Sequence, residues 1–414
     1  MDFDDAPEEA ALRTEARAWL DTVAKLRGEG DGSWKAYRAY TEEEEADQLA
    51  TAIAWQATIQ DNGWAGLHWP EEFGGRGMSA HMAGVFNEER ARYDVPANFF
   101  MIGIDMVGPT LMAHGTDEQR QRHLLPMLRG EEKWCQLFSE PGAGSDLAGL
   151  STRAVRDGDE YVINGQKVWT SSAHHADYGI LLARTDPDAP KHKGITYFLV
   201  DMRSAGIDVR PLRQIDGAIH FNEVFLTDVR IPATNAVGVE GEGWRVAMTT
   251  LLAERTAIGA GGQTRFTDIL ELARACGADT DPHWRQELAR LYTTYQLQRF
   301  IGYRVRTAVS HGRAPGPESS AAKLLNSRHV GHVGDVVVGL QGAAGMLWHE
   351  SARDDGFWQD VFLFQWSSRI GGGTEQIQRN IIGERVLGLP GEPRTDKDVP
   401  FRELAKMTKG ASRS

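Results

Sequence analysis

The sequence of 414 residues predicts an α+β protein that is helical at both ends and built of antiparallel strands in the middle. Two observations support this prediction. Apolar residues recur at helical spacing up to about residue 130 and again after "GEGW", whereas residues 134–232 hold short apolar runs separated by turn residues. We therefore expect three domains, at residues 1–133, 134–240 and 241–414.

Capping boxes mark two helices of the first domain. Each places a threonine at the N-cap and a glutamate or glutamine three residues later, in "TEEE" at 41–44 and in "TDEQ" at 116–119. Further upstream, Leu12, Ala16 and Trp19 recur at helical spacing and share one face of an expected helix. The first domain is therefore expected to be helical.

Turn pairs divide the middle domain into short strands. "KWCQLF" begins the series, and the pairs Asp157-Gly158 and Asn164-Gly165 each predict a hairpin turn. Four further runs follow, the last of them "FNEVFLTDVRIP". This pattern is typical of an antiparallel barrel or sandwich.

Helical spacing returns in the third domain. Asp281 followed by Pro282 is typical of an N-cap with proline at the first helical position, and Leu288 and Leu291 then fall on one face. Further helices are expected at residues 317–340 and 374–387, and "GAGG" at 259–262 is expected inside another helix.

Composition excludes several classes of protein. A net charge of -13 argues against nucleic-acid and anionic-membrane binding, which need clustered lysine and arginine. No apolar run approaches the length that spans a bilayer, and the acidic, amphipathic start does not resemble a signal peptide. Two cysteines, Cys135 and Cys276, cannot form a disulfide framework and fit a reducing compartment. We therefore expect a cytoplasmic protein without membrane insertion.

Two motifs of the middle domain suit a flat ligand. "LFSEPGAGSD", residues 137–146, ends a strand in a small-residue loop whose N–H groups and hydroxyl can cradle a planar or anionic group, although an ordinary strand-to-loop turn has the same composition. "NGQKVWTSS", residues 164–172, puts Trp169 and Ser171 on the same face of a strand. An indole face beside a donor suits a heteroaromatic ring, and a core tryptophan is the alternative.

A third motif, "SSRIGGGTEQIQRN" at residues 367–380, places three glycines before a helix. Glycine costs backbone entropy, so these positions indicate a need for space or for free N–H groups. The helix start at Thr374 favours an anion such as a phosphate.

The three motifs, together with "FNEVFLTDVRIP" and "GEGW", occur in this order and at these spacings in the acyl-CoA dehydrogenase family, which the chain resembles over nearly its whole length. The resemblance implies an N-terminal helical domain, a middle β domain and a C-terminal four-helix bundle. It also implies an FAD cofactor, an acyl-CoA substrate and an electron-transfer flavoprotein or similar acceptor. The expected assembly is a homotetramer or an α2β2 heterotetramer.

The resemblance also implies the roles of individual residues. Trp169 would cover the flavin ring, with Ser171 near its N5 side. The family's cross-subunit string Arg-x-x-Phe-Gly is not recognisable in this chain, where Arg274 stands as its remnant. "VGLQGAAG" resembles the family's other cross-subunit loop, with Gln341 off the usual register. FAD contacts are expected at Phe138, Ser139, Gly144, Ser145, Trp169, Ser171, Arg274, Gln341, Gly342, Thr374 and Gln376, and substrate contacts at Ser145, Arg255, Gly371 and Gly373.

The chain departs from the best-known members at the catalytic loop. Their glutamate stands where this chain has Gly372, whose backbone N–H survives as a donor to the thioester carbonyl, worth about 3 kcal/mol. Isovaleryl-CoA and long-chain members instead carry the base on the first helix of the C-terminal domain, directly before an arginine. Glu254 precedes Arg255 here and is the expected base, with a solvated helix glutamate as the alternative. Glu375 is expected to complement the helix dipole.

The prediction is an acyl-CoA dehydrogenase that introduces an α,β-double bond, with the acyl group left open between short, branched, long fatty and sterol-derived chains. Two alternatives remain: a subunit of a heterotetramer with little activity alone, and a flavin oxidase or monooxygenase on the same fold. No metal is expected. The pair His329 and His332 is interpreted as packed or solvated, and His174 and His175 as loop residues.

Overall fold

The computed structural model describes residues 5–27, 29, 41–259, 264–310, 319–391, 393, 396 and 398–404. The "GAGG" prediction beyond Gly259 and the side chain of Arg255 lie outside the described part. The chain divides into two compact units, residues 1–254 with 394–414 and residues 255–393. No helix of the described part has the length and hydrophobicity needed to span a membrane.

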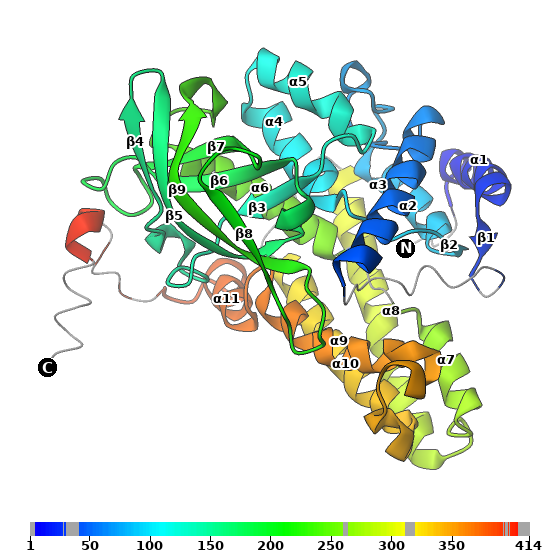
Figure 1. The fold of residues 1–414 in the computed structure, drawn as a ribbon. Coiled ribbons are helices and arrows are strands. Elements are labelled where there is room, and N and C mark those ends of the chain that lie inside the picture. The colour runs from blue at the N-terminus through cyan, green and yellow to red at the C-terminus, as the bar shows by residue number, and fades with distance from the viewer. Residues whose placement is uncertain are drawn as a thin grey trace, which may run out of the picture. The chain divides into compact units, whose positions relative to one another are not determined.

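The N-terminal part is helical, as predicted (Figure 1). Thr41 and Thr116 cap their helices, each accepting at its hydroxyl from a backbone N–H at 3.2 Å, which confirms both capping boxes. Trp69 and Leu111 are fully buried in its core. The elements are α1 Pro7–Val23, β1 Lys25–Leu26, α2 Glu42–Asp61, α3 Ala80–Arg90, β2 Tyr93–Asp94, a π-helical segment Ile102–Val107, α4 Gly108–His114 and α5 Asp117–Leu128.

The middle part of the chain forms one eight-stranded sheet, in the order β10-β7-β6-β4-β5-β9-β8 with β3 also beside β6. Most pairs are antiparallel, but β3 and β4 pair with β6 in parallel, which corrects the expectation of purely antiparallel strands. The strands are β3 Trp134–Leu137, β4 Arg153–Asp157, β5 Glu160–Ser171, β6 Tyr178–Arg184, β7 Ile195–Asp201, β8 Ile207–Leu212, β9 Phe221–Pro232 and β10 Ala236–Val237.

One of the two predicted hairpin turns is present. Asp157 pairs with Glu160, and Gly158 adopts a positive φ of 64° in the turn between β4 and β5. The turn predicted at Asn164-Gly165 is wrong, because this pair lies inside β5 at a shift in register with β9. A side chain at Gly165 would lie 2.2 Å from the Thr152 hydroxyl, so this glycine permits close strand packing instead.

The C-terminal part is helical, as predicted, and α9 packs against both α8 and α10. Asp281 caps α8 by accepting from the backbone N–H of His283 at 2.8 Å and of Trp284 at 3.2 Å. Helix α10 was not predicted, and the expected helix at 374–387 is a short α-helix followed by a π-helical segment, Ile382–Val386. The helices are α6 Gly243–Gly259, α7 Phe266–Ala275, α8 Pro282–Ser310, α9 Ser319–Leu340, α10 Phe357–Ile370 and α11 Glu375–Ile381.

Candidate active site

The loop after β3 and the end of β5 lie side by side. The backbone N–H of Val168 donates to the Ser139 carbonyl at 3.0 Å, which joins the first two motifs directly. Phe138 is buried and meets the ring of Tyr197 edge-on, with centroids 5.9 Å apart. Ser139 is half-buried. Because the neighbouring Phe138 packs into the core, the backbone that carries the Ser139 hydroxyl is held in place.

A buried ion pair supports this junction. The ammonium of Lys167, fully buried, donates to the Glu140 carboxylate at 2.8 Å and to the Phe138 carbonyl at 3.0 Å. Glu140 also accepts from the N–H groups of Ser151 and Thr152 at 2.7 and 2.9 Å. Burial alone would raise the pKa of Glu140, but the charge and hydrogen bonds around it lower that pKa to about 2. Sequence analysis assigned no role to Glu140 or Lys167.

Trp169 stands out from the sheet. It adopts a positive φ of 61°, at a shift in the β5–β9 register between Lys167 and Thr170. Its side chain is 62% exposed and meets Phe221 edge-on. A β-bulge re-aims a side chain, and a strained non-glycine residue persists only where the surroundings hold it. An exposed indole held in this way offers a flat face to a planar ligand.

The adjoining loop positions are open. Gly144 and Ser145 are exposed, and a side chain added at Gly144 would meet no atom within 4 Å. Ser171, two residues beyond Trp169, is half-buried. An indole face, hydroxyls and an open small-residue loop therefore occur together, and this set of groups fits a flavin with its phosphate chain.

Glu254 lies beside the strand that leads into this loop. Its Oε2 accepts from the side-chain amide of Gln136, on β3, at 3.4 Å. One turn earlier on α6, the buried Thr250 hydroxyl meets the hydroxyls of Thr110 at 2.8 Å and Tyr197 at 3.2 Å, which fixes this helix against its neighbours. Glu254 is partly buried. Its carboxylate is thus held close to the first of the two motifs.

The three glycines before α11 are explained largely by backbone geometry. Gly372 and Gly373 adopt positive φ values of 64° and 87°, which favour glycine. The amide of Gln378 donates to both of their carbonyls, at 3.2 and 3.3 Å, and a side chain at Gly373 would lie 2.7 Å from that amide. Gly371 ends α10 with an ordinary φ of -65°. Thr374 caps α11, its hydroxyl accepting from the Ile377 N–H at 3.2 Å.

Glu375 is engaged in ion pairs. Its buried carboxylate accepts from Arg369 at 2.9 Å and from Arg379 at 3.2 Å. Burial opposes the ionised form, but the two guanidinium groups hold the pKa of Glu375 below its ordinary value. A carboxylate stabilised in this way is a poor proton acceptor, so the loop helix does not offer a competing base.

The remaining predicted cofactor positions lie in the second unit. Arg274, in the last turn of α7, and Gln376 are exposed. Gln341 donates to the Val337 carbonyl at 3.0 Å, while its Oε1 is buried without a hydrogen-bond partner in the described part of the chain. Gly342 beside it has a positive φ of 56° and open space around it. The unpaired oxygen of Gln341 and the open space at Gly342 fit a loop that contacts a bound ligand.

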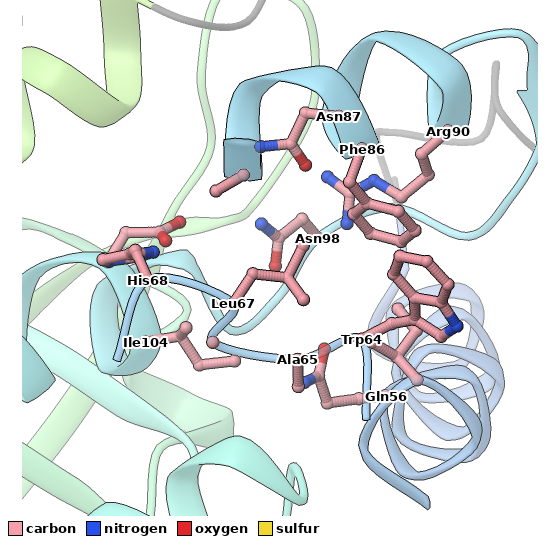
Figure 2. Close-up of a pocket in the computed structure, with 14 residues that line it drawn as sticks. Gln56, Trp64, Ala65, Leu67, His68, Phe86, Asn87, Arg90, Asn98 and Ile104 are labelled. Atoms are coloured by element: carbon pink, nitrogen blue, oxygen red, sulfur yellow. The ribbon is translucent and has the colours of Figure 1, made fainter. Parts of the chain in front are cut away.

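A cavity of about 110 Å³ lies in the N-terminal helical part (Figure 2). Burial raises the pKa of Asp105 in its wall to about 6, against the opposing charge of Arg90. Ile104 and Asp105 belong to the π-helical segment, which packs on β3 where Gly103 meets Trp134. The lining mixes apolar and polar groups, among them Trp64, Leu67, Phe86, Arg90, Asn98 and Asp105.

Three family models of acyl-CoA dehydrogenases match the chain in sequence order. The N-terminal domain model matches residues 6–131, the middle domain model residues 135–246 and the C-terminal domain model residues 241–387. Together they cover most of the chain. The protein therefore belongs to the acyl-CoA dehydrogenase family, whose members are flavoprotein oxidoreductases.

Individual relatives extend this comparison. The acyl-CoA dehydrogenase IpdE1 of Mycobacterium tuberculosis is 40% identical over 391 residues, covering 92% of this chain and 98% of that protein. Among solved structures, the Tcur3481-Tcur3483 steroid ACAD matches with a TM-score of 0.82 and 31% identity, covering 95% of this chain and 100% of that chain. The ChsE4-ChsE5 complex from Mycobacterium tuberculosis matches at 0.77 and 31%, with the same coverage. All three align over nearly their whole lengths.

Proposed function

We propose that this protein is an FAD-dependent acyl-CoA dehydrogenase in which Glu254 removes the α-proton of the thioester. The supporting observation is the position of Glu254, whose carboxylate lies 3.4 Å from Gln136 on β3, two residues before Phe138 in the sequence. A carboxylate held beside the loop that suits the flavin is placed to act as a base. The competing Glu375 is already paired with two arginines.

The chain supplies proton transfer, orientation and exclusion of water. Glu254 accepts the α-proton, and a positioned base contributes about 10²–10⁴-fold to a rate. The backbone N–H of Gly372 would donate to the thioester carbonyl, which acidifies that proton. The bound flavin supplies the acceptor for the hydride that leaves the β-carbon. Closing of the site around acyl-CoA would exclude water from the carboxylate.

FAD is the proposed flavin, since the exposed indole and the open loop suit its ring and phosphates. Phe138, Ser139, Gly144, Ser145, Trp169 and Ser171 would hold the flavin side. Arg274, Gln341, Gly342, Thr374 and Gln376 would hold the phosphate and adenosine side, in part across a subunit boundary. The buried Oε1 of Gln341, which has no hydrogen-bond partner among the described residues, supports the second assignment.

We propose a steroid-derived acyl group as the substrate class. One support is the similarity of the chain to the Tcur3481-Tcur3483 steroid ACAD. The other is the cavity next to the π-helical segment, whose lining includes the polar residues Arg90, Asn98 and Asp105. A ring system with polar substituents matches such a lining better than a straight fatty chain.

The proposed assembly is an α2β2 heterotetramer with an electron-transfer flavoprotein or similar acceptor as redox partner. The ChsE4-ChsE5 relative is described as a complex of two chains. In the second unit, large apolar side chains are exposed, as expected for surfaces that another subunit covers. They include Met346 at 83%, Leu387 at 66%, Ile370 at 65% and Leu389 at 56%.

Titration of the purified protein with a panel of acyl-CoA esters under anaerobic conditions tests the proposal. The protein should be yellow, release FAD on denaturation, and lose its flavin absorption with formation of an enoyl-CoA. A CoA thioester of a steroid side chain should cause this loss of flavin absorption at a lower concentration than a straight-chain thioester of similar size. Fast oxygen consumption without enoyl product would indicate an oxidase, and a colourless protein that gains flavin only with a second chain would indicate an incomplete subunit.

A further inference from the structure

Three potential metal ligands meet at a place that the proposed reaction does not use. Glu45, on α2, is only 3% exposed, and His174 and His175 belong to the short turn directly after β5. The Nε2 of His174 lies 2.7 Å and the Nε2 of His175 3.6 Å from Glu45 Oε2. One donor atom from each residue lies within 4.8 Å of the other two.

The hydrogen bonds around Asn222 determine which nitrogen of His174 carries a proton. The Asn222 amide nitrogen donates to the carbonyls of Thr170 and His220, at 3.0 and 3.2 Å. Its oxygen therefore faces His174 Nδ1 at 2.9 Å and must accept from it. In neutral His174, the Nε2 lone pair then points at the carboxylate of Glu45. Two acceptors at 2.7 Å need a cation or a proton between them.

The ring nitrogen of His175 that faces Glu45 is unsatisfied. This Nε2 is buried and has no hydrogen-bond partner among the described residues, although Glu45 Oε2 lies 3.6 Å away. A buried nitrogen without a partner costs free energy unless something binds it. Both imidazoles therefore direct a ring nitrogen toward the same carboxylate oxygen.

The spacing of these atoms is close to that of a zinc site. Zinc binds nitrogen and carboxylate oxygen at about 2.0–2.2 Å, so neighbouring ligands of a tetrahedral site are about 3.3 Å apart. The two distances to Glu45 Oε2, 2.7 and 3.6 Å, lie on either side of this value. Small side-chain shifts would bring both distances to the value expected for two ligands of one zinc ion. The Asn222 oxygen that accepts from His174 is the kind of outer partner that orients a metal-binding histidine.

We propose that Glu45, His174 and His175 bind one divalent transition-metal ion, with zinc the best match, and that this ion fastens α2 to the turn after Trp169 and Ser171. Two imidazoles and one carboxylate select such ions over magnesium and calcium, which prefer oxygen ligands. The fourth position is left for water. The site is separate from the proposed dehydrogenation, and its role would be to hold the end of β5.

The competing possibility is an imidazolium–carboxylate pair without metal. Burial opposes the charged forms, but the hydrogen bond from His174 and the nearby charges of both imidazoles, when they are protonated, lower the pKa of Glu45 to about 2, and Glu45 in turn raises the pKa of His174. A proton and a metal ion would compete for the same lone pair, so metal binding should release protons.

The test uses the full-length protein as purified, treated with EDTA and returned to metal-free buffer. Calorimetric titration with zinc should give one saturable site per chain with proton release. Cobalt should give absorption beyond the flavin bands. Glu45→Gln and His175→Gln should each weaken binding by at least about 100-fold while keeping the far-ultraviolet circular dichroism of the wild type.

His332→Gln is the matched control, because it removes a histidine 2.8 Å from Glu287 outside the cluster. It should leave zinc binding unchanged. The proposal is overturned if the wild type takes up neither zinc nor cobalt in a saturable way, or if Glu45→Gln and His175→Gln bind as well as the wild type. If the wild type binds neither metal, a change in the pH dependence of unfolding in Glu45→Gln would identify the metal-free ion pair.

Discussion

The loop after β3 and the loop before α11 both combine glycines with polar residues, but different interactions support them. In the first, a buried ion pair between Glu140 and Lys167 ties the backbone to β5, where the nearby Trp169 is strained and exposed. In the second, positive φ angles and the amide of Gln378, which donates to the carbonyls of Gly372 and Gly373, account for the glycines.

Glycine-rich motifs within one chain can therefore have different physical causes. The first loop leaves Gly144 with open space around it, as a ligand-binding loop requires. The second uses its glycines to turn from α10 into α11, since other residues rarely adopt a φ of 87°. Each loop should therefore respond to a different kind of substitution.

The largest stability effect should come from the ion pair. Glu140→Gln leaves the buried ammonium of Lys167 without its counter-charge, and such a loss costs about 3–5 kcal/mol of unfolding free energy at neutral pH. Because the folded pKa of Glu140 is about 2 against an ordinary 4.5, its contribution is complete above pH 4.5 and disappears as the pH falls toward 2. Urea unfolding at pH 7 and pH 3 measures both effects.

Glu160→Gln provides the control for this prediction, since Glu160 pairs with Arg230 in an exposed bridge. It should leave the unfolding free energy nearly unchanged. An equal loss in both variants, or a Glu140→Gln variant as stable as the wild type at pH 7, would contradict the role given to the buried pair.

The glycine loop should show a smaller effect that depends on φ. Gly373→Ala forces a side chain into a φ of 87° and against the Gln378 amide, which should cost about 1–2 kcal/mol. Gly371→Ala, at a φ of -65° and with its nearest atom at 3.2 Å, should be almost neutral. Thermal unfolding of the two variants makes the comparison. Equal destabilisation would mean that contact, not backbone conformation, selects these glycines.

The smallest effect is expected at Trp169. Trp169→Gly should stabilise the flavin-free protein by up to about 1 kcal/mol, because glycine tolerates a φ of 61°. The same substitution should weaken flavin binding through loss of the indole face. Trp169→Ala keeps the strain and should show only the second effect. A glycine variant that loses stability without flavin would show that the indole serves the fold.

Local signals in the sequence predicted much of the fold. The capping boxes at Thr41 and Thr116 and the cap at Asp281 act within a few residues, so they are legible without tertiary context. The parallel pairing of β3 with β6 joins Trp134 to Tyr178, and no local pattern reports a partner so distant in the chain. Asn164-Gly165 has turn composition, but packing against Thr152 determines its conformation.

The site was predictable in part. The motifs pointed to the exposed Trp169 and the half-buried Ser139, because their residue types suit a flavin. Sequence analysis missed Lys167 as a support, because a lysine is usually solvated and only the structure places its ammonium at Glu140. The signal was present in the alternation of β5, because Lys167 continues the every-second-residue spacing of the buried Tyr161 and Ile163.

One measurement tests most directly whether Glu254 is the base. It is the rate at which acyl-CoA bleaches the flavin of the Glu254→Gln variant, followed by anaerobic stopped-flow. Glutamine keeps the shape and hydrogen bonding of the side chain, so FAD and substrate should still bind. Bleaching should slow by about 10²–10⁴-fold, the usual contribution of a positioned base. Glu242→Gln, an exposed residue just before the same helix, should bleach at the wild-type rate. A Glu254→Gln variant that bleaches as fast as the wild type would contradict the assignment of Glu254 as the base.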